Sequence, residues 1–139
     1  MKSLTAILIL LAALGTSSYS HAQCDTTAHY AANYLGSSFV SDGQSYRALI
    51  YDDQIAEFTT TLYGDQTYRI VAFSGMEKEQ LIFSVYDQND RELFSNENYQ
   101  NSPYWDFEIE STIDCRIEAK LDPVKQKSGC AVLLIGFER

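Results

Sequence analysis

Few side chains in this sequence have the types and the spacing that catalysis needs. Apart from His21, which falls in a predicted leader, the chain has one histidine, His29. A histidine-dependent triad or a multi-histidine zinc site therefore has little to draw on. The sequence also lacks the Gly-x-Ser-x-Gly, Walker and His-Glu-x-x-His motifs. We predict no catalytic, cofactor-binding or metal-binding residue, and we expect His29 to be a surface or half-buried helix residue.

Four consecutive polar residues, Asp87-Gln88-Asn89-Asp90, could be read as the start of a calcium-binding loop. An EF-hand loop needs an oxygen ligand at its fifth position and a glutamate at its twelfth. Counted from Asp87, these positions hold Arg91 and Asn98. The segment is therefore predicted to be a hairpin turn, and the pair Asp52-Asp53 is interpreted as another solvated turn.

The segment 104–110, YWDFEIE, offers aromatic rings that could stack on a sugar or a peptide. Its apolar and acidic residues alternate with a period of two, as in a strand with one buried face. The apolar face carries Trp105, Phe107 and Ile109. We therefore expect Trp105 to be buried in the core. Tyr99 and Tyr104 are the candidate surface contacts, together with the polar loop 96–103.

The first 22 residues have the layout of a secretory signal peptide. Lys2 precedes an apolar run from Leu4 to Leu14, and small residues stand at the positions that a signal peptidase reads before the bond after Ala22. The run is shorter than the roughly 20 residues that span a bilayer as a helix. We expect cleavage after Ala22, no membrane insertion of the mature chain, and a secreted or periplasmic protein. A lipoprotein anchored at Cys24 is disfavoured, because the preceding residues do not fit the lipoprotein pattern.

Removal of the signal peptide leaves 117 of the 139 residues, enough for one domain, 23–139, and too few for two. Loss of Lys2 changes the formal net charge from −9 to −10. A chain this acidic is a poor match for nucleic acid or for anionic lipid. We predict no nucleic-acid partner. The charge keeps the protein soluble, and a partner with a basic face is the more specific interpretation.

The mature chain predicts one helix followed by strands. The segment 25–35 has Asp25 or Thr26 as a capping residue, several alanines, and Gly36 to end it. Alternating apolar residues then predict strands at 45–51, 55–63, 67–73, 81–86, 91–95, 104–110, 114–121 and 130–137. Because no helix separates these segments, the strands are expected to be antiparallel. The predicted fold class is all-β, an antiparallel β-sandwich with one N-terminal helix.

Two glycine-containing dipeptides are predicted to be turns. Asp42-Gly43 is expected to precede the first strand. Gly64-Asp65 is expected to form the tight turn of a hairpin, with Gly64 at positive φ.

Two runs, 62–70 (LYGDQTYRI) and 82–94 (IFSVYDQNDRELF), resemble the bacterial pre-peptidase C-terminal domain. The resemblance covers roughly residues 57–121 and implies a jelly-roll-like fold and a secreted accessory or binding module without a catalytic role. Asp90 stands where a turn glycine is usual in that family. The mature chain is also similar to small uncharacterised secreted proteins of bacteria, which implies no activity.

Three cysteines, Cys24, Cys115 and Cys130, allow at most one intrachain disulfide. If the last two strands formed a hairpin centred near Lys125, Cys115 and Cys130 would be offset by about five residues, or about 17 Å. Bridged Cα atoms lie within about 7 Å. We therefore expect no Cys115–Cys130 bridge and a buried Cys115 thiol. A bridge from Cys24 to either cysteine or to another molecule stays open.

The leading hypothesis is a secreted, non-enzymatic binding or accessory module whose partner is an unknown protein or glycan. A small hydrolase or lyase that uses Asp, Glu and Tyr from distant strands is the first alternative. An envelope or matrix protein that self-associates through sheet edges is the second. Perturbed carboxylates that converge in one cleft would favour the enzyme. The sequence does not specify an oligomeric state.

Overall fold

The structure is a computed structural model that describes the backbone of residues 19–139 and the side chains from residue 24 onward. Most of the predicted signal peptide thus lies outside the described residues. Helix α2 (Tyr19–Ala32) comes first, and η1 (Asn96–Tyr99) is a short 3-10 helix. The strands are β1 (Phe39–Tyr51), β2 (Ile55–Leu62), β3 (Gln66–Phe73), β4 (Leu81–Tyr86), β5 (Glu92–Ser95), β6 (Tyr104–Ile109), β7 (Ile113–Leu121) and β8 (Ser128–Glu138).

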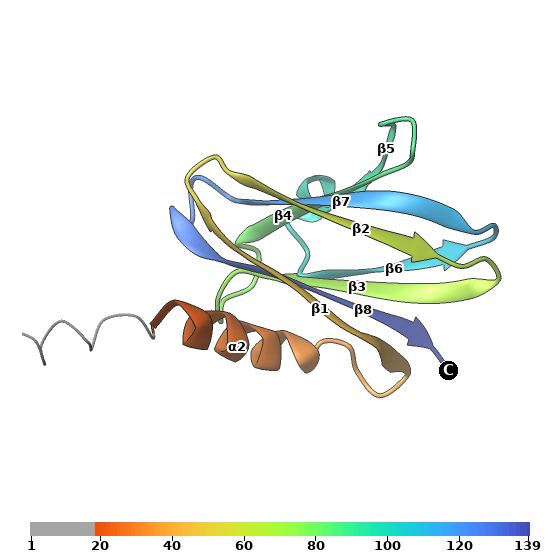
Figure 1. Ribbon diagram of the computed structural model, residues 1–139, viewed down its shortest axis with the longest axis horizontal. Helices are drawn as coiled ribbons and strands as arrows, with labels where there is room; N and C mark the ends of the chain where they lie inside the picture. Colours follow the sequence, from red (N-terminus) through yellow and green to blue (C-terminus); the bar gives the residue numbers. More distant parts are fainter. Residues whose placement is uncertain (1–18) are drawn as a thin grey trace, which may run out of the picture.

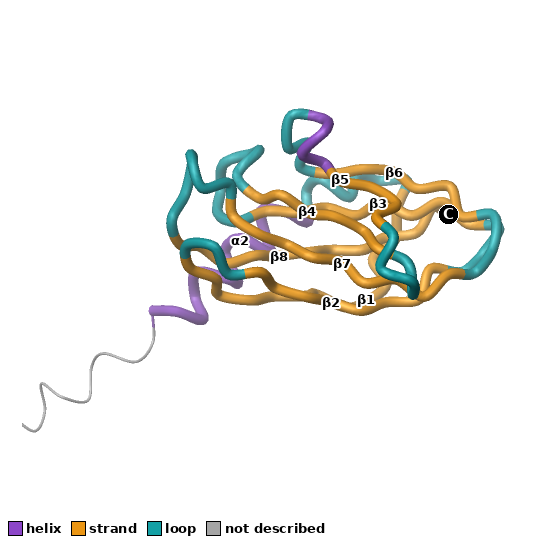
Figure 2. Tube along the Cα trace, turned by 90° about the horizontal axis from the view of Figure 1, so that it is seen from above, coloured by secondary structure: helices purple, strands orange, loops and turns teal. Residues whose placement is uncertain are grey.

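The eight strands form two four-stranded antiparallel sheets that face each other (Figures 1 and 2). Sheet A has the order β1-β8-β3-β6 and sheet B the order β2-β7-β4-β5. The pairs β1·β8, β2·β7, β3·β6 and β4·β5 belong alternately to sheet A and sheet B. Together the four pairs correspond to one long antiparallel hairpin that has its tip at the β4–β5 turn and is folded over into a sandwich. The predicted jelly-roll-like β-sandwich is confirmed.

The main core lies between the two sheets and follows the period-two alternation of the strands. Every sheet strand except the short β5 and the edge strand β6 contributes at least one side chain that is nearly inaccessible to water. Among the most deeply buried are Ile70, Phe83, Ile117 and Leu133. The aromatic side chains of β5 and β6 close the core along one open side of the sandwich.

A second core lies between α2 and the outer face of sheet A. Ala28, Ala31 and Leu35 pack there against apolar side chains of β3 and β8, namely Val71, Phe73, Val132 and Leu134. Because β8 is covered on both faces, its residues are buried almost continuously from Gly129 to Gly136. Figure 1 shows α2 on the sheet A side, which leaves the outer face of sheet B without a covering helix in the described part of the chain.

The helix differs from its predicted range at both ends. It begins at Tyr19, so the predicted cleavage site lies within it, and the predicted cap Asp25 instead pairs with Arg47 of β1. It ends at Ala32, and residues 33–35 continue as a tighter turn before Gly36, which has a φ of +73°. None of the described helices is both long and apolar enough to cross a membrane.

The predicted hairpin between β2 and β3 is wrong. β2 pairs with β7 in sheet B, whereas β3 pairs with β6 and β8 in sheet A, so Gly64-Asp65 carries the chain from one sheet to the other. The positive φ belongs to Asp65, at +58°, and not to Gly64. A Cβ on Gly64 would come within 2.8 Å of the Glu110 carbonyl oxygen. Close approach of backbone, rather than a left-handed conformation, therefore requires this glycine.

The expectation of a turn at Asp42-Gly43 is also wrong. β1 begins at Phe39, and the dipeptide lies within it as an irregularity in the pairing with β8 between Ser41 and Ser45. Gly43 has a φ of +83°, which fits a bulge in an edge strand. The other predicted strands match the observed ones to within two residues at each end.

The disulfide joins Cys24 to Cys130, with their Cα atoms 5.3 Å apart, and so fastens α2 to β8. Cys115 is free and buried, as predicted. Cys115 and Cys130 are not bridged, as predicted. The predicted reason, an offset between the two cysteines in a hairpin of the last two strands, is wrong, because β7 and β8 lie in different sheets. Disulfides of this kind persist in oxidising compartments outside the cytoplasm.

Candidate functional site

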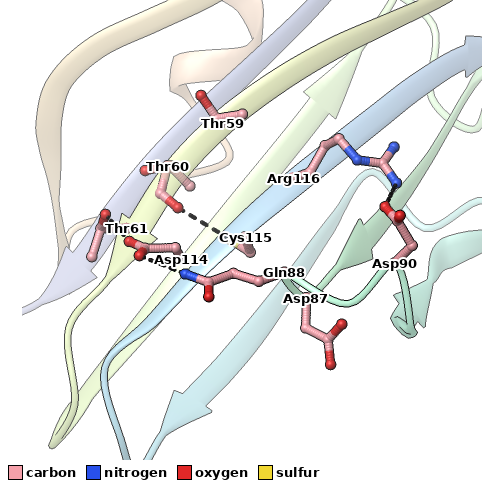
Figure 3. Close-up of a pocket in the computed structure, with 9 residues that line it drawn as sticks. All are labelled: Thr59, Thr60, Thr61, Asp87, Gln88, Asp90, Asp114, Cys115 and Arg116. Carbon is pink, nitrogen blue, oxygen red and sulfur yellow. Dashed lines mark hydrogen bonds and ion pairs between the residues drawn. The ribbon is translucent and has the colours of Figure 1, made fainter.

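A polar groove of about 510 Å³ opens on the outer face of sheet B (Figure 3). It lies over β2 and β7 beside the β4–β5 turn, and it is lined by Thr59, Thr60, Thr61, Asp87, Gln88, Asp90, Asp114, Cys115 and Arg116. Carboxylates, an arginine, a thiol and hydroxyls also line catalytic clefts. The ion pairs, hydrogen bonds and burial of each group therefore decide whether a reaction can occur there.

The charge of Arg116 is already neutralised by its neighbours. Its guanidinium pairs with Glu118, with Asp90 at 2.9 Å and with Glu57 at 3.6 Å. The hydrogen bonds to Glu118 and Asp90 raise the pKa of Arg116 above its usual value. The group also lies over the Tyr86 ring, 4.7 Å from its centroid. Arg116 thus holds the sheet surface together and is not a free anion-binding group.

The thiol in this groove is not an activated nucleophile. Cys115 is 5% exposed, and burial raises its pKa to about 11. Its Sγ contacts the Thr60 carbonyl oxygen at 3.6 Å. Asp114 accepts hydrogen bonds from Thr61 and Gln88, at 2.5 and 2.8 Å. The polar groups of the groove therefore bind one another, and this arrangement gives no support to the hydrolase hypothesis.

A second candidate lies at one end of the sandwich, here called the loop end, made of the connecting loops 52–54, 74–80, 96–103 and 122–127. Val124 at the tip of the last loop is 92% exposed. Other large apolar side chains exposed at this end are Tyr51, Ile55 and Met76. Apolar surface of this kind on a monomer often marks a contact with a partner.

The loop that carries Val124 is fixed from within by Asp122. The Asp122 carboxylate accepts a hydrogen bond of 3.0 Å from the Val124 amide, and its backbone carbonyl accepts bonds of 3.0 Å from the Lys125 and Gln126 amides. This Asx-type turn followed by a helical turn leaves the 122–126 backbone little freedom.

Three neighbouring loops hold the same segment from outside. The Gln126 side chain donates to the Ser74 carbonyl at 2.9 Å and accepts from the Ser74 hydroxyl at 2.6 Å. Lys125 donates to the Glu79 carbonyl at 2.9 Å. The Asp52 amide donates to the Lys127 carbonyl at 2.7 Å, and Asn101 binds Asp122. The tip is therefore both exposed and pre-organised.

A groove of about 590 Å³ adjoins this tip on the sheet B side. Its apolar lining consists of Ile55, Ile82, Leu121 and Pro123. Its charged lining consists of Asp52, Asp53, Glu97, Lys120 and Lys127. Protein interfaces commonly combine apolar and charged side chains in this way.

The structure places the predicted contact residues Tyr99 and Tyr104 in different surroundings. Tyr99 on η1 is half-exposed, and its ring lies 4.3 Å from that of Trp105 and 5.6 Å from that of Phe94. Tyr104 lies on the other face of β6, where its ring covers Arg69. Arg69 in turn donates to the Tyr34 and Leu35 carbonyls that follow α2 and pairs with Asp106. The two tyrosines therefore form no common platform.

Trp105 is on the core side of β6, as the alternation predicts, but it is half-buried rather than buried. Because β6 is the edge of sheet A, no further strand covers the outer side of the indole. Tyr99 covers part of it instead.

The other residues that the sequence singled out have structural roles. His29 is exposed on α2, and Asp52-Asp53 is an exposed turn, as predicted. The Asp87 segment is the predicted hairpin turn between β4 and β5: its carboxylate accepts from the Asn89 and Arg91 amides at 2.9 and 3.0 Å. The bond from the Arg91 amide lowers the pKa of Asp87. Asp90 has a φ of +58°, a left-handed conformation that glycine adopts most easily. This explains why the pre-peptidase C-terminal domain usually has a glycine at this position of the turn.

Sequence reasoning missed the loop end, although one signal was present. The loop between the last two strands is polar except for Pro123-Val124, and an apolar side chain in a polar turn has no core to enter. The contacts that fix this loop come from residues about 20 to 75 positions away, at Asn101, Glu79, Ser74 and Asp52.

No protein-family model matches the sequence, and no curated protein is significantly similar to it. Among solved structures, the chain is similar to the crystal structure of Aeromonas hydrophila PliG, a periplasmic lysozyme inhibitor of g-type lysozyme. The TM-score is 0.53 at 9% sequence identity, and the match covers 68% of this chain and 85% of that chain. At this identity the likeness is one of fold. Of the resemblance to the pre-peptidase C-terminal domain, the jelly-roll-like fold is confirmed, and no family model supports the rest.

Proposed function

We propose that the protein is a secreted or periplasmic binding protein that attaches through its loop end to a protein partner and inhibits it, with a g-type lysozyme as the candidate partner. The observation that carries this proposal is Val124, a 92% exposed apolar side chain on a loop whose backbone is held by three neighbouring loops.

A fixed loop favours tight binding for an energetic reason. Ordering one flexible residue costs about 1–2 kcal/mol in conformational entropy, and a pre-organised loop does not incur this cost on association. Burial of Val124, Pro123 and Ile55 against a partner would contribute about 25 cal/mol for each Å² of apolar surface. The amides of Asp122, Val124, Lys125 and Gln126 already have acceptors within the protein, so burial of the loop does not leave these donors without a partner.

The charges around the loop end favour a partner with a basic surface. Asp52, Asp53 and Glu97 line the adjoining groove together with Lys120 and Lys127, and the whole chain has a net charge of −9. An excess of negative charge speeds the approach of a basic partner at low salt.

The location and the fold support the same proposal. The signal peptide predicts export, and the Cys24–Cys130 disulfide fits an oxidising compartment. The similar solved structure is a periplasmic inhibitor of g-type lysozyme with the same kind of fold. A binding role also agrees with a polar groove in which no described group is activated for catalysis.

Direct binding to a purified g-type lysozyme tests the proposal. Surface-immobilised protein is expected to bind the lysozyme, and Val124→Asp is expected to weaken binding by tenfold or more, since about 1.4 kcal/mol corresponds to a factor of ten. Leu93→Asp is the matched control, because Leu93 is 45% exposed on β5, beside the β4–β5 turn and away from the loop end. Absence of binding, or equal loss in both variants, would contradict the proposal.

A further inference from the structure

The four edge strands of the sandwich are protected from other strands to different degrees. β6 carries acidic side chains on its outer face, β5 has only four residues, and β1 is interrupted between Ser41 and Ser45. β2 has eight residues, pairs with β7 in unbroken register from Ile55 to Leu62, and contains no proline, glycine or lysine. Figure 2 shows β1 and β2 along one side of the sandwich, away from β5 and β6.

The free edge of β2 lies between two grooves. Thr59, Thr60 and Thr61 line the polar groove of Figure 3 on the outer face of sheet B. The same three threonines line a groove of about 610 Å³ that opens between β2 and β1, beside the irregular part of β1. Its lining combines apolar side chains, among them Tyr46, Tyr63 and Phe137, with the polar side chains of Asp42, Gln44 and Gln66.

This arrangement matches what an added strand requires. In an antiparallel strand, every second residue directs both its N–H and its C=O away from the existing partner. The side chains of an added strand point alternately to the two faces of the sheet. On β2, one face leads into the groove between β1 and β2, which offers aromatic side chains, and the other leads onto the polar outer surface.

We propose that the free edge of β2 binds an extended segment of a partner protein, which adds a ninth strand to the sandwich. Main-chain hydrogen bonds supply affinity in this mode of recognition, and alternate side chains supply specificity. Apolar side chains of the segment enter the groove between β1 and β2. Basic side chains lie on the outer face. There Glu57, Asp90 and Glu118 share the single cation Arg116, and Asp114 lies beside Thr61, so negative charge is in excess.

Charge argues against a second copy of this chain as the occupant. Each copy has a net charge of −9, and the outer face of β2 itself carries Glu57, so two copies repel each other at this edge. The two grooves beside this edge adjoin Thr59, Thr60 and Thr61, whereas the loop end adjoins Ile55 at the start of β2. The inference does not rest on the proposed lysozyme partner.

Amide hydrogen exchange by NMR tests the proposal on the secreted form of the protein with its disulfide intact. The probe is an eight-residue peptide of alternating valine and lysine. The controls are a peptide with the same residues in two blocks and a peptide of alternating valine and glutamate. We expect the first peptide to slow exchange at every second amide between Ile55 and Leu62, and the controls to bind at least tenfold more weakly.

Lysine and glutamate at position 59 should change the affinity for the valine–lysine peptide in opposite directions. Thr59 is exposed on the outer face, where opposite charges on neighbouring strands attract and like charges repel. Thr59→Lys is expected to weaken the valine–lysine peptide about threefold and Thr59→Glu to strengthen it about threefold. Thr67→Lys on β3 of sheet A is the control and should change nothing.

Three outcomes would overturn the inference. One is uniform or absent protection of β2 at millimolar peptide. Another is equal binding of the block peptide. The third is alternate protection that depends on protein concentration without peptide, which would assign the edge to a second copy.

Discussion

The side-chain amide of Asn101 donates a hydrogen bond of 2.8 Å to the carboxylate of Asp122, and the same amide donates to the Glu79 carbonyl at 3.2 Å. One buried side chain therefore joins the loops 74–80, 96–103 and 122–127. Asn101 has a φ of +52°, a left-handed conformation that asparagine tolerates better than most residues. The rigidity of the loop that carries Val124 depends on this contact.

Asp122→Ala is expected to loosen the loop end. The variant removes the carboxylate that accepts from the Val124 amide and from Asn101, which keeps the Glu79 carbonyl as its second acceptor. Loss of such hydrogen bonds is expected to cost about 1–2 kcal/mol. Urea unfolding should show this loss, and hydrogen exchange at residues 123–127 should speed up. Asp53→Ala, in the neighbouring exposed turn, should shift the free energy of unfolding by less than about 0.5 kcal/mol. Unchanged exchange in the Asp122 variant would refute the role of the contact.

Reduction of the Cys24–Cys130 disulfide is expected to destabilise the fold. The bridge closes a loop with a sequence separation of 106 residues, and loss of a native disulfide from a small secreted domain costs about 2–5 kcal/mol. Thermal unfolding with and without reductant measures the effect. The Cys24→Ala variant should unfold at the lower temperature in both conditions. An equal melting temperature of the wild type with and without reductant would count against the bridge.

Gly64 and Gly43 should respond differently to alanine. A Cβ at Gly64 would meet the backbone of residues 110–112 at 2.8–3.1 Å, so we expect Gly64→Ala to cost about 2 kcal/mol through overpacking. Gly43 has a φ of +83° but nothing within 4 Å of its Cβ position, so Gly43→Ala should cost about 1 kcal/mol from backbone strain alone. Urea unfolding of both variants checks the order. The reverse order would contradict the close approach of the 110–112 backbone to Gly64.

The Cys115 thiol should be inert in the folded protein. Burial raises its pKa from 9.0 to about 11, so a thiol reagent at pH 8 should modify it only after unfolding. The native state holds the proton more tightly than the unfolded chain, so this group's contribution to stability is complete below pH 9 and is lost as pH rises toward 11. Cys115→Ala should flatten this part of the stability profile. Rapid modification of the native wild type would show that the thiol is accessible.

The sequence predicted the strands well because alternation records which face of each strand is buried. It predicted Phe107 and Ile109 on one face, and it placed Cys115 in the core. It could not predict which strands pair, because the Gly64-Asp65 dipeptide looks the same whether the chain turns within a sheet or crosses between sheets. Both corrected connections, β2–β3 and β7–β8, are such crossings.

The candidate site was harder to predict than the fold. Tyr99 and Tyr104 stood out as aromatic residues in and beside a polar loop, yet Tyr104 covers Arg69 and Tyr99 covers Trp105. The loop of Val124 owes its rigidity to Ser74, Glu79 and Asn101, which belong to other loops. No local pattern in the sequence encodes a contact among loops that only the folded sandwich brings together.

Inhibition of a g-type lysozyme is the most direct test of the proposed function. Hydrolysis of peptidoglycan by the lysozyme is measured at increasing concentrations of the wild-type protein and of Val124→Asp. We expect the wild type to inhibit in a saturable way, and the variant to need at least tenfold more protein for the same inhibition, with both melting at the same temperature. Full lysozyme activity at saturating wild-type protein, or equal inhibition by the two proteins, would contradict the account.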